Sequence, residues 1–330
     1  MPDIPNQPYE VAVEADIRVR LRDGVNLATD VHRPARDGVP VSARFPVILE
    51  RTPYGKSAPS RTESRAQIAA HFVRHGYIVI YQDCRGRHGS EGEFVKYLSD
   101  AEDGADTVAW ILAQPWCDGR IGTMGLSYAA HTQMALASLG PKGLAAMVLD
   151  CGGFSNAHAS AIRQGGAFEM RQVTWAYNQA KESPPAKANP LVKAALEAED
   201  IKAWFKSFPW KPGHSPVRHV PEYEAYLFDL WSRGTFDASW KKPGIYAAGF
   251  YERVPDIAQI HMSSWYDPYV RTATENFLGL RSKKRKAPIR LIMGPWLHGD
   301  RSSSFSGDVD FGPRAPLDGN LGPSWHEFRR

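Results

Sequence analysis

The sequence predicts an α/β protein with a mainly parallel sheet, helices on both faces of that sheet and a helical insertion. Strand-like and helix-like stretches alternate at short spacing through residues 45–149, which is typical of a parallel sheet with crossover helices. The alternation stops near residue 152 and returns over residues 257–293. A chain of 330 residues is long enough for one large domain of this class with an insertion.

The first predicted strands surround an Asp-Gly turn. Apolar residues alternate with arginines over 17–21, the pair Asp23-Gly24 follows, and a second apolar stretch runs over 25–31. This pattern predicts two strands joined by a turn. The short apolar run 45–49 predicts another strand, which enters a loop rich in Pro and Gly.

The central elements follow in regular order. Residues 77–81 are β-branched or aromatic throughout, as expected of a strand that is buried on both faces. Acidic residues near the start of 100–112 favour a helix there, because the helix dipole stabilises negative charge at its N-terminus. The other predicted elements are helices at 65–75 and 128–139 and strands at 121–124, 144–149, 257–262 and 289–293.

Residues 156–243 have a different character. They contain five tryptophans, proline-rich joints and helical stretches such as 190–206, without a clear buried strand. We interpret this segment as a helical cap insertion. The predicted division is therefore a core made of residues 1–155 and 244–330, with a cap at 156–243.

Composition and charge argue against several classes of protein. Hydrophobic residues make up 43% and charged residues 23%, which is ordinary for a globular chain. There is no apolar run long enough to predict a transmembrane helix, and a net charge of +4 gives no reason to expect nucleic-acid binding. Three cysteines and a polar N-terminus without signal-peptide features predict a cytoplasmic protein with reduced thiols.

A serine occupies the place where a catalytic nucleophile is expected in such a fold. Ser127 lies between the predicted strand 121–124 and the predicted helix 128–139, which is the context of a nucleophile elbow. The G-x-S-x-G pattern is incomplete, because Ala129 replaces the second Gly. On this context alone, a helix N-cap serine is an equally good interpretation.

An acid and a histidine follow in the order that a Ser-Asp-His triad requires. Asp267 comes after the predicted strand 257–262, and His298 comes after the predicted strand 289–293. The competing residues are placed less well: Asp256 precedes its strand, His261 lies inside one, and His326 lies near the C-terminus.

Several short motifs together carry a resemblance to a known family. The chain resembles the cocaine esterase and X-Pro dipeptidyl-peptidase family of serine α/β-hydrolases (CocE/NonD-like hydrolases), which includes α-amino acid ester hydrolases. The similar stretches run from about residue 15 to 300. They are Arg22-Asp23-Gly24-Val25-x-Leu27, His32-Arg33-Pro34, Arg51-Thr52-Pro53-Tyr54, Gln82-Asp83-Cys84-Arg85-Gly86-Arg87, Ser90-Glu91-Gly92, Gln114-Pro115-Trp116, Gly125-Leu126-Ser127-Tyr128, Trp265-Tyr266-Asp267 and Gly294-Pro295-Trp296-Leu297-His298.

The resemblance implies an α/β-hydrolase fold and a role for each site residue. It implies Ser127 as nucleophile, His298 as general base and Asp267 as its orienting acid. It also implies an oxyanion hole made by the Tyr54 hydroxyl and the Tyr128 amide, and it implies neither a cofactor nor a metal.

The chain departs from the family pattern in two places. Ala130 stands where the family usually has Gly, and the chain ends without the C-terminal jelly-roll domain that family members usually carry. The second departure suggests a short family member or a fragment.

Two other groups of polar residues are interpreted as structural and not as metal-binding or catalytic. His71 and His75 have metal-ligand spacing on a predicted helix, but position 72 is Phe instead of the Glu of a zinc protease motif. Asp83, Arg85 and Arg87 are interpreted as a structural cluster of ion pairs and hydrogen bonds at a strand end.

The predicted function is hydrolysis of a small-molecule ester or amide by acyl transfer, with no nucleic-acid or membrane partner. One alternative is an X-Pro dipeptidyl-peptidase, which needs a carboxylate for the substrate amine. Glu169, Glu182 and Glu222 are candidates for that carboxylate. An alternative from another class is a non-catalytic fragment or interaction module that lacks a domain.

Overall fold

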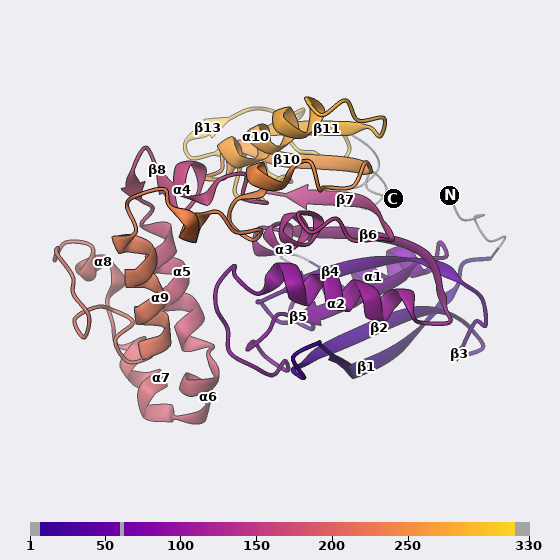
Figure 1. The fold of residues 1–330 in the computed structure, drawn as a ribbon, viewed down its shortest axis with the longest axis horizontal. Helices are drawn as coiled ribbons and strands as arrows, with labels where there is room; N and C mark the ends of the chain where they lie inside the picture. The colour runs from indigo at the N-terminus through magenta and orange to yellow at the C-terminus, as the bar shows by residue number, and fades with distance from the viewer. Residues whose placement is uncertain (1–6, 60–62, 321–330) are drawn as a thin grey trace.

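The computed structural model describes residues 7–59 and 63–320, and these residues form a nine-stranded sheet flanked by helices (Figure 1). The strand order is β1-β2-β5-β4-β6-β7-β10-β11, with β3 paired to β2. The strands of this sheet are β1 Glu10–Arg20, β2 Asn26–Arg36, β3 Val39–Pro40, β4 Phe45–Thr52, β5 Ile78–Asp83, β6 Cys117–Leu126, β7 Leu144–Asp150, β10 Ala258–Tyr266 and β11 Ile289–Leu297.

The sheet is parallel over most of its width, so the predicted α/β architecture is confirmed. Strands β5, β4, β6, β7, β10 and β11 are mutually parallel neighbours, whereas β1 and β2 form the predicted antiparallel hairpin and β2 pairs antiparallel with β5. Because the parallel strands run in one direction, their carboxyl ends meet at one edge of the sheet.

Four helices flank the sheet and the remainder lie mainly in the inserted segment. The flanking helices are α1 Arg65–Val73, α2 Asp100–Leu112, α3 Tyr128–Ala137 and α10 Val270–Arg281. The remaining helices are α4 Ala157–Ser160, α5 Arg171–Lys181, α6 Pro184–Ala188, α7 Pro190–Glu197, α8 Ile201–Trp204, α9 Pro221–Ser232 and the 3-10 turns η1 Ala238–Trp240 and η2 Ala247–Phe250. Two small hairpins complete the chain, β8 Arg163–Gln164 with β9 Ala167–Phe168, and β12 Phe305–Ser306 with β13 Val309–Asp310.

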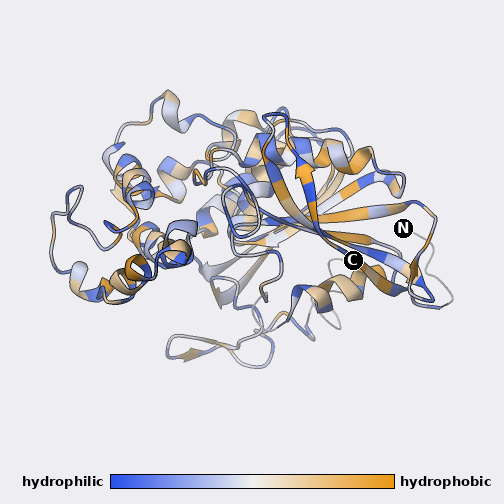
Figure 2. Cartoon of the chain, turned by 90° about the horizontal axis from the view of Figure 1, so that it is seen from below, coloured by the Kyte–Doolittle hydropathy of each residue, from blue (hydrophilic) through white to orange (hydrophobic). Residues whose placement is uncertain are grey.

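Alternating residues of the central strands pack on different helices, which shows that the sheet is covered on both faces. Ile78 and Ile80 of β5 share an apolar cluster with α2, whereas Val79 and Tyr81 share one with α1. Successive strand residues point to opposite faces, so α1 covers one face and α2 the other. Figure 2 shows the hydrophobic residues concentrated along these central strands.

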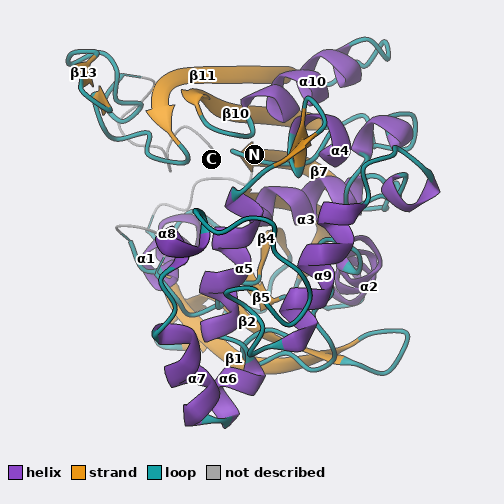
Figure 3. Cartoon of the chain, turned by 90° about the vertical axis from the view of Figure 1, so that its left-hand side faces the viewer, coloured by secondary structure: helices purple, strands orange, loops and turns teal. Residues whose placement is uncertain are grey.

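Helices α5 to α9 of the inserted segment stand together beside the carboxyl edge of the sheet (Figures 1 and 3). They have an apolar cluster of their own, which includes Tyr177, Leu196 and Trp210. The predicted helical stretch 190–206 is present as two helices, α7 and α8. Asp200 causes the division by capping α8, with its carboxylate accepting the backbone N–H groups of Lys202 and Ala203.

The last two parallel strands are longer than predicted, and this places the predicted acid and base directly at strand ends. β10 continues to Tyr266 and β11 to Leu297, with Ser263 paired to Met293 and Ser264 to Gly294. Buried serines and a Gly-Pro pair concealed these extensions in the sequence pattern. Among the described residues, no helix has the length and apolar character needed to cross a membrane.

Candidate active site

Ser127 lies in the tight turn between β6 and α3, with an unusual backbone conformation. Its φ is 62° and its ψ is −116°, which a residue other than Gly rarely adopts. The turn is held by the Ser127 amide, which donates to the Asp150 carbonyl at 2.8 Å. The side chain is partly exposed, as a nucleophile must be.

Small residues allow the strand and the helix to approach at this turn. A Cβ on Gly125 would lie 2.4 Å from the Cβ of Ala129, so only one of these positions can carry a methyl group. This contact explains why Ala129 is tolerated in the incomplete motif: Gly125 already leaves the room that its methyl occupies.

Ala130, the other departure from the family pattern, is accommodated in a similar way. A Cβ on Gly152 would lie 2.5 Å from the Ser127 carbonyl oxygen and 2.9 Å from the Ala130 Cβ. Gly152, which follows β7, therefore provides the space that the family usually gains by having Gly at the helix position.

Asp267 and His298 form a hydrogen-bonded pair at the ends of β10 and β11. Nδ1 of His298 lies 3.0 Å from Oδ1 of Asp267. The Asp267 side chain is fully buried, whereas 24% of the His298 side chain is exposed. The acid also accepts the backbone N–H of Tyr269 at 2.9 Å on Oδ1 and the Ser263 hydroxyl at 2.8 Å on Oδ2.

These contacts keep Asp267 ionised. Burial raises the pKa of its carboxyl, but the hydrogen bond and charge of His298, with smaller contributions from Cys151 and the Tyr269 amide, bring the pKa below its ordinary value. A carboxylate anchored in this way can fix the orientation and tautomer of the imidazole.

Tyr269 links the histidine to the helix that follows Ser127. Its ring contacts the His298 ring with centroids 5.4 Å apart and the His131 ring with centroids 5.5 Å apart, both edge-on. His131 lies one turn into α3, where Nδ1 accepts the Gly153 amide at 2.9 Å. Burial, assisted by the nearby charges of Lys96 and His298, holds the pKa of His131 well below its usual range. The serine turn and the His-Asp pair therefore share one edge of the sheet.

Tyr54 comes from the loop after β4, as predicted, and its hydroxyl lies at the serine. The phenol oxygen accepts the Trp175 Nε1–H at 3.2 Å, and the hydroxyl is close enough to Ser127 for that side chain to affect the pKa of the phenol. Burial raises the pKa of the phenol, and its interactions with Trp175 and Ser127 offset part of that rise. The Tyr54 and Tyr128 rings meet edge-on with centroids 6.5 Å apart.

Tyr128 is the first residue of α3, so its amide is among those with no acceptor inside the helix. Its side chain is buried, and the hydroxyl accepts the Tyr97 amide at 2.8 Å. The backbone of Tyr128, not its phenol, is thus available to a group at Ser127.

Two members of the predicted structural cluster brace the Tyr54 loop, whereas the third, Arg85, forms ion pairs with Asp23 and Asp103. Arg87 is buried and donates to the Pro53 carbonyl at 3.1 Å, and Asp83 accepts the Lys56 amide at 2.6 Å. Arg87 also reaches the inserted segment through Tyr223 and Gln179. The loop that carries Tyr54 is therefore fixed from two sides.

The other residues weighed in the sequence lie away from this edge or have other roles. Asp256 caps the loop before β11 by accepting the amides of Lys286 and Ala287, and His261 is buried within β10. His75 bonds through Nδ1 to the His71 carbonyl of its own helix at 2.7 Å. His326 lies outside the described residues.

Within residues 7–59 and 63–320, one group of three potential metal ligands lies close together, and it contains the His-Asp pair itself. Its members are Cys151, Asp267 and His298. Burial and the neighbouring carboxylates raise the pKa of the Cys151 thiol well above its ordinary value, so the sulfur keeps its proton and donates to the acid.

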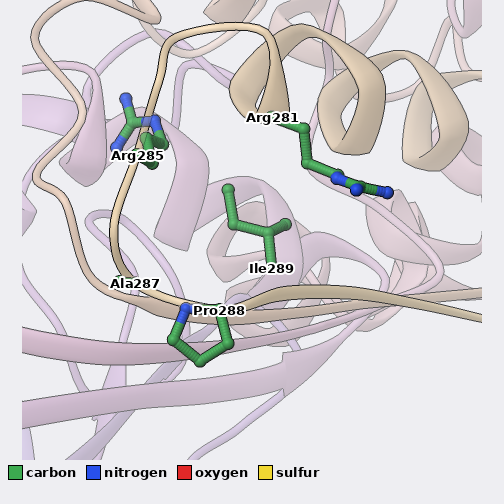
Figure 4. Close-up of a pocket in the computed structure, with 5 residues that line it drawn as sticks. All are labelled: Arg281, Arg285, Ala287, Pro288 and Ile289. Atoms are coloured by element: carbon green, nitrogen blue, oxygen red, sulfur yellow. The ribbon is translucent and has the colours of Figure 1, made fainter.

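A separate cavity of about 420 Å³ lies at the opposite end of β11 (Figure 4). It is lined by Arg281, Arg285 and residues 287–289. The Arg285 guanidinium already donates to the carbonyls of Tyr251, Val254 and Pro255. This cavity adjoins the amino end of the strand and is not part of the candidate site.

Sequence reasoning missed two residues next to the site, Trp175 and Lys96. Trp175 belongs to the inserted segment and was not distinguished from the other tryptophans there. Lys96 is 4% exposed, and its ammonium lies 3.5 Å from the Trp175 ring centroid. Neither residue belongs to a motif, so only a contact across the fold could reveal it.

Comparison with known proteins agrees with this arrangement. A family model described as X-Pro dipeptidyl-peptidase (S15 family) matches residues 23–300. The chain belongs to this family. The S15 family model covers the strand ends that carry Tyr54, Ser127, Asp267 and His298, so the resemblance predicted from the motifs is confirmed.

Individual relatives are hydrolases that are about twice as long. The chain is 32% identical over 297 residues to cocaine esterase of Rhodococcus sp. (strain MB1 Bresler), covering 87% of this chain and 49% of that protein. Its fold is similar to an α-amino acid ester hydrolase (TM-score 0.65, 20% identity, 96% of this chain and 55% of that one). It is also similar to a CocE/NonD family hydrolase of Staphylococcus aureus (TM-score 0.62, 21% identity, covering 86% of this chain and 46% of that one). These likenesses establish the α/β-hydrolase fold. The chain spans about half the length of the relatives it matches.

Proposed function

We propose that this chain is a serine hydrolase that cleaves carboxylic ester bonds through an acyl-enzyme on Ser127. The observation that carries the proposal is the meeting of three features at one edge of the sheet. Ser127 sits in a strained turn, a phenol hydroxyl lies at its side chain, and a buried carboxylate orients a partly exposed histidine.

In the proposed reaction His298 is the general base and then the general acid. Its Nδ1–H is held by Asp267, which leaves Nε2 to accept the Ser127 proton as Oγ attacks the ester carbonyl. The same nitrogen then gives the proton to the departing alcohol. Water, deprotonated by His298, then attacks the acyl carbon; the bond to Oγ breaks, the acid is released, and His298 returns the proton to Ser127.

The negative charge that forms on the carbonyl oxygen needs donors that are already in place. We assign this role to the Tyr54 hydroxyl and the Tyr128 amide. The Tyr54 hydroxyl lies next to Ser127, and the Tyr128 amide belongs to the first residue of α3, where the helix dipole favours negative charge.

Release of X-Pro dipeptides is the second candidate activity, and one observation favours it. Of the three glutamates considered for the substrate amine, Glu169 is linked through Gln164 to the turn that follows Asp267. Gln164 donates to Glu169 at 3.1 Å and to the carbonyl of Pro268, which follows the acid, at 3.4 Å. Glu182 and Glu222 are exposed on the inserted segment.

Covalent labelling tests the proposal directly. A fluorophosphonate probe should label the folded wild-type chain and should not label Ser127→Ala, because only an activated serine attacks the phosphorus. Ser138→Ala is a matched control, since this buried serine only caps its own helix. Absence of labelling in a folded wild-type chain would favour the non-catalytic module.

A substrate panel then separates the two activities. Nitrophenyl esters of neutral acids should be hydrolysed faster than Xaa-Pro anilides. A peptidase would show the reverse preference, and Glu169→Gln would then reduce its activity on substrates with a free amine while sparing neutral esters.

A further inference from the structure

We propose that Trp175 is a positioning residue, which directs the hydroxyl proton of Tyr54 toward the oxygen atoms at Ser127. The inference rests on the proposed function, since it concerns how the oxyanion donor is prepared. It starts from one contact between the inserted segment and the sheet: Nε1 of Trp175 lies 3.2 Å from the Tyr54 hydroxyl oxygen.

The chemistry of the two groups fixes the direction of this hydrogen bond. An indole N–H can only donate, so the phenol oxygen must accept it. Tyr54 has a single proton to give, and the indole N–H already occupies the side of its oxygen that faces the inserted segment. With the indole in place, the phenol proton is directed away from the inserted segment, and we infer that it serves the oxygen atoms at Ser127. Accepting one hydrogen bond also strengthens the one that the phenol donates.

The indole is held on several sides, which is what a positioning role requires. Its ring stacks on Tyr128 and on Phe94, in each case with centroids 6.0 Å apart. The Lys96 ammonium lies 3.5 Å from the ring centroid and is itself fixed by Gln172, whose side-chain oxygen accepts from Nζ at 2.9 Å.

Trp175 lies on α5 and Tyr54 on the loop after β4, so this bond makes the inserted segment part of the oxyanion machinery. The segment would thus contribute to the rate of the chemical step and not only to the shape of the pocket. A tryptophan that merely filled space would have no reason to aim its nitrogen at the phenol.

The test is a double-mutant cycle between Trp175→Phe and Tyr54→Phe, measured as kcat and KM on one nitrophenyl ester. Trp175→Phe keeps an aromatic ring for stacking and removes the N–H. It should lower kcat about tenfold with KM nearly unchanged, as expected for loss of one neutral hydrogen bond. In the Tyr54→Phe background the same change should have almost no effect, because the hydroxyl that Trp175 directs is gone.

Trp210→Phe is the matched control. Its indole also belongs to the inserted segment and also donates from Nε1, at 3.1 Å to the Trp204 carbonyl, but its ring packs on other aromatic residues of that segment, namely Trp204, Phe205, Phe208 and Trp231. This change should leave kcat unaltered. If Trp175→Phe does not fold, incorporation of benzothienylalanine at position 175 keeps the bicyclic ring and removes only the N–H, and the same cycle is run with it.

The outcomes separate the inference from the proposed function. Two results would overturn the positioning role and leave the serine hydrolase standing. One is a loss of kcat on Trp175→Phe that is equal in the wild-type and Tyr54→Phe backgrounds. The other is an unchanged kcat for Trp175→Phe when Tyr54→Phe is impaired. Full activity of Tyr54→Phe would overturn the positioning role together with the oxyanion assignment of Tyr54. Strong coupling in the cycle supports both.

Discussion

Nδ1 of His298 and the backbone N–H of Tyr269 both bond to the same oxygen of Asp267, at 3.0 Å and 2.9 Å. The second oxygen of the acid is held by the Ser263 hydroxyl. The carboxylate therefore cannot turn to give its histidine a different contact. Its orientation is set by β10 and the turn that follows, before any substrate arrives.

Asp267→Asn should lower kcat by about 10³–10⁴-fold while the chain stays folded. An amide in this position can offer its NH₂ group to Nδ1 and stabilise the wrong imidazole tautomer, as in other triads of this kind. Steady-state kinetics on a nitrophenyl ester measures the effect. Asp256→Asn is the control, because that carboxylate only accepts loop amides. A kcat within threefold of wild type would remove Asp267 from the mechanism.

Tyr54→Phe should lower kcat by about 10²–10³-fold with little change in KM, which corresponds to about 2.7–4 kcal/mol of transition-state stabilisation. The change keeps the ring that packs on Tyr128 and removes the hydroxyl at Ser127. Tyr266→Phe is a suitable control, since this half-exposed tyrosine contacts Phe311 outside the site. If turnover is preserved, the second donor must be another group, and the amides of Gly55 and Lys56 would be examined next.

The sequence predicted the fold and the placing of the candidate residues because both depend on local patterns. Strands buried on both faces, a serine between a strand and a helix, and polar residues after strands are visible within short windows. The predicted positions of Tyr54, Ser127, Asp267 and His298 all fall at the carboxyl edge of the sheet.

What the sequence did not reveal depends on contacts between distant segments. Tyr54 and Trp175 are 121 positions apart, and no periodicity relates them. Lys96 resembles a surface lysine in sequence, yet it lies under the inserted segment. The room for Ala130 comes from Gly152, which follows a different strand. Such contacts appear only when the chain is folded.

Lys96 gives a prediction about stability and pH. Burial holds the pKa of this ammonium well below its ordinary value, and within the described residues its hydrogen-bond partner is the neutral side chain of Gln172 instead of an acid. Because the folded state binds the proton less tightly than the unfolded state, the charge destabilises the fold at low pH. This penalty is relieved as the pH rises from the folded pKa toward the unfolded value of about 10.4.

Lys96→Met should therefore raise the free energy of unfolding by about 1–3 kcal/mol below the folded pKa, since it replaces an unpaired buried charge by an apolar chain of similar length. The gain should shrink toward pH 10. Urea unfolding of both proteins between pH 6 and 10 measures it, with Lys193→Met as a control on an exposed lysine. If the free energy of unfolding changes with pH in the same way for Lys96→Met and for wild type, the buried amine imposes no such penalty.

The backbone of Ser127 leads to a prediction that separates strain from chemistry. A φ of 62° with a ψ of −116° costs about 1–3 kcal/mol for a residue with a Cβ, and Gly adopts it more readily. Ser127→Ala and Ser127→Gly should both be inactive. The Gly variant should nevertheless be more stable than the Ala variant by about 1 kcal/mol, because relief of strain exceeds the extra entropy of Gly in the unfolded chain. At Ser138, where φ is −64°, the same two substitutions should show the opposite order. Urea midpoints of the four variants decide the matter, and greater stability of Ser127→Ala than of Ser127→Gly would mean that the turn stores no strain at the nucleophile.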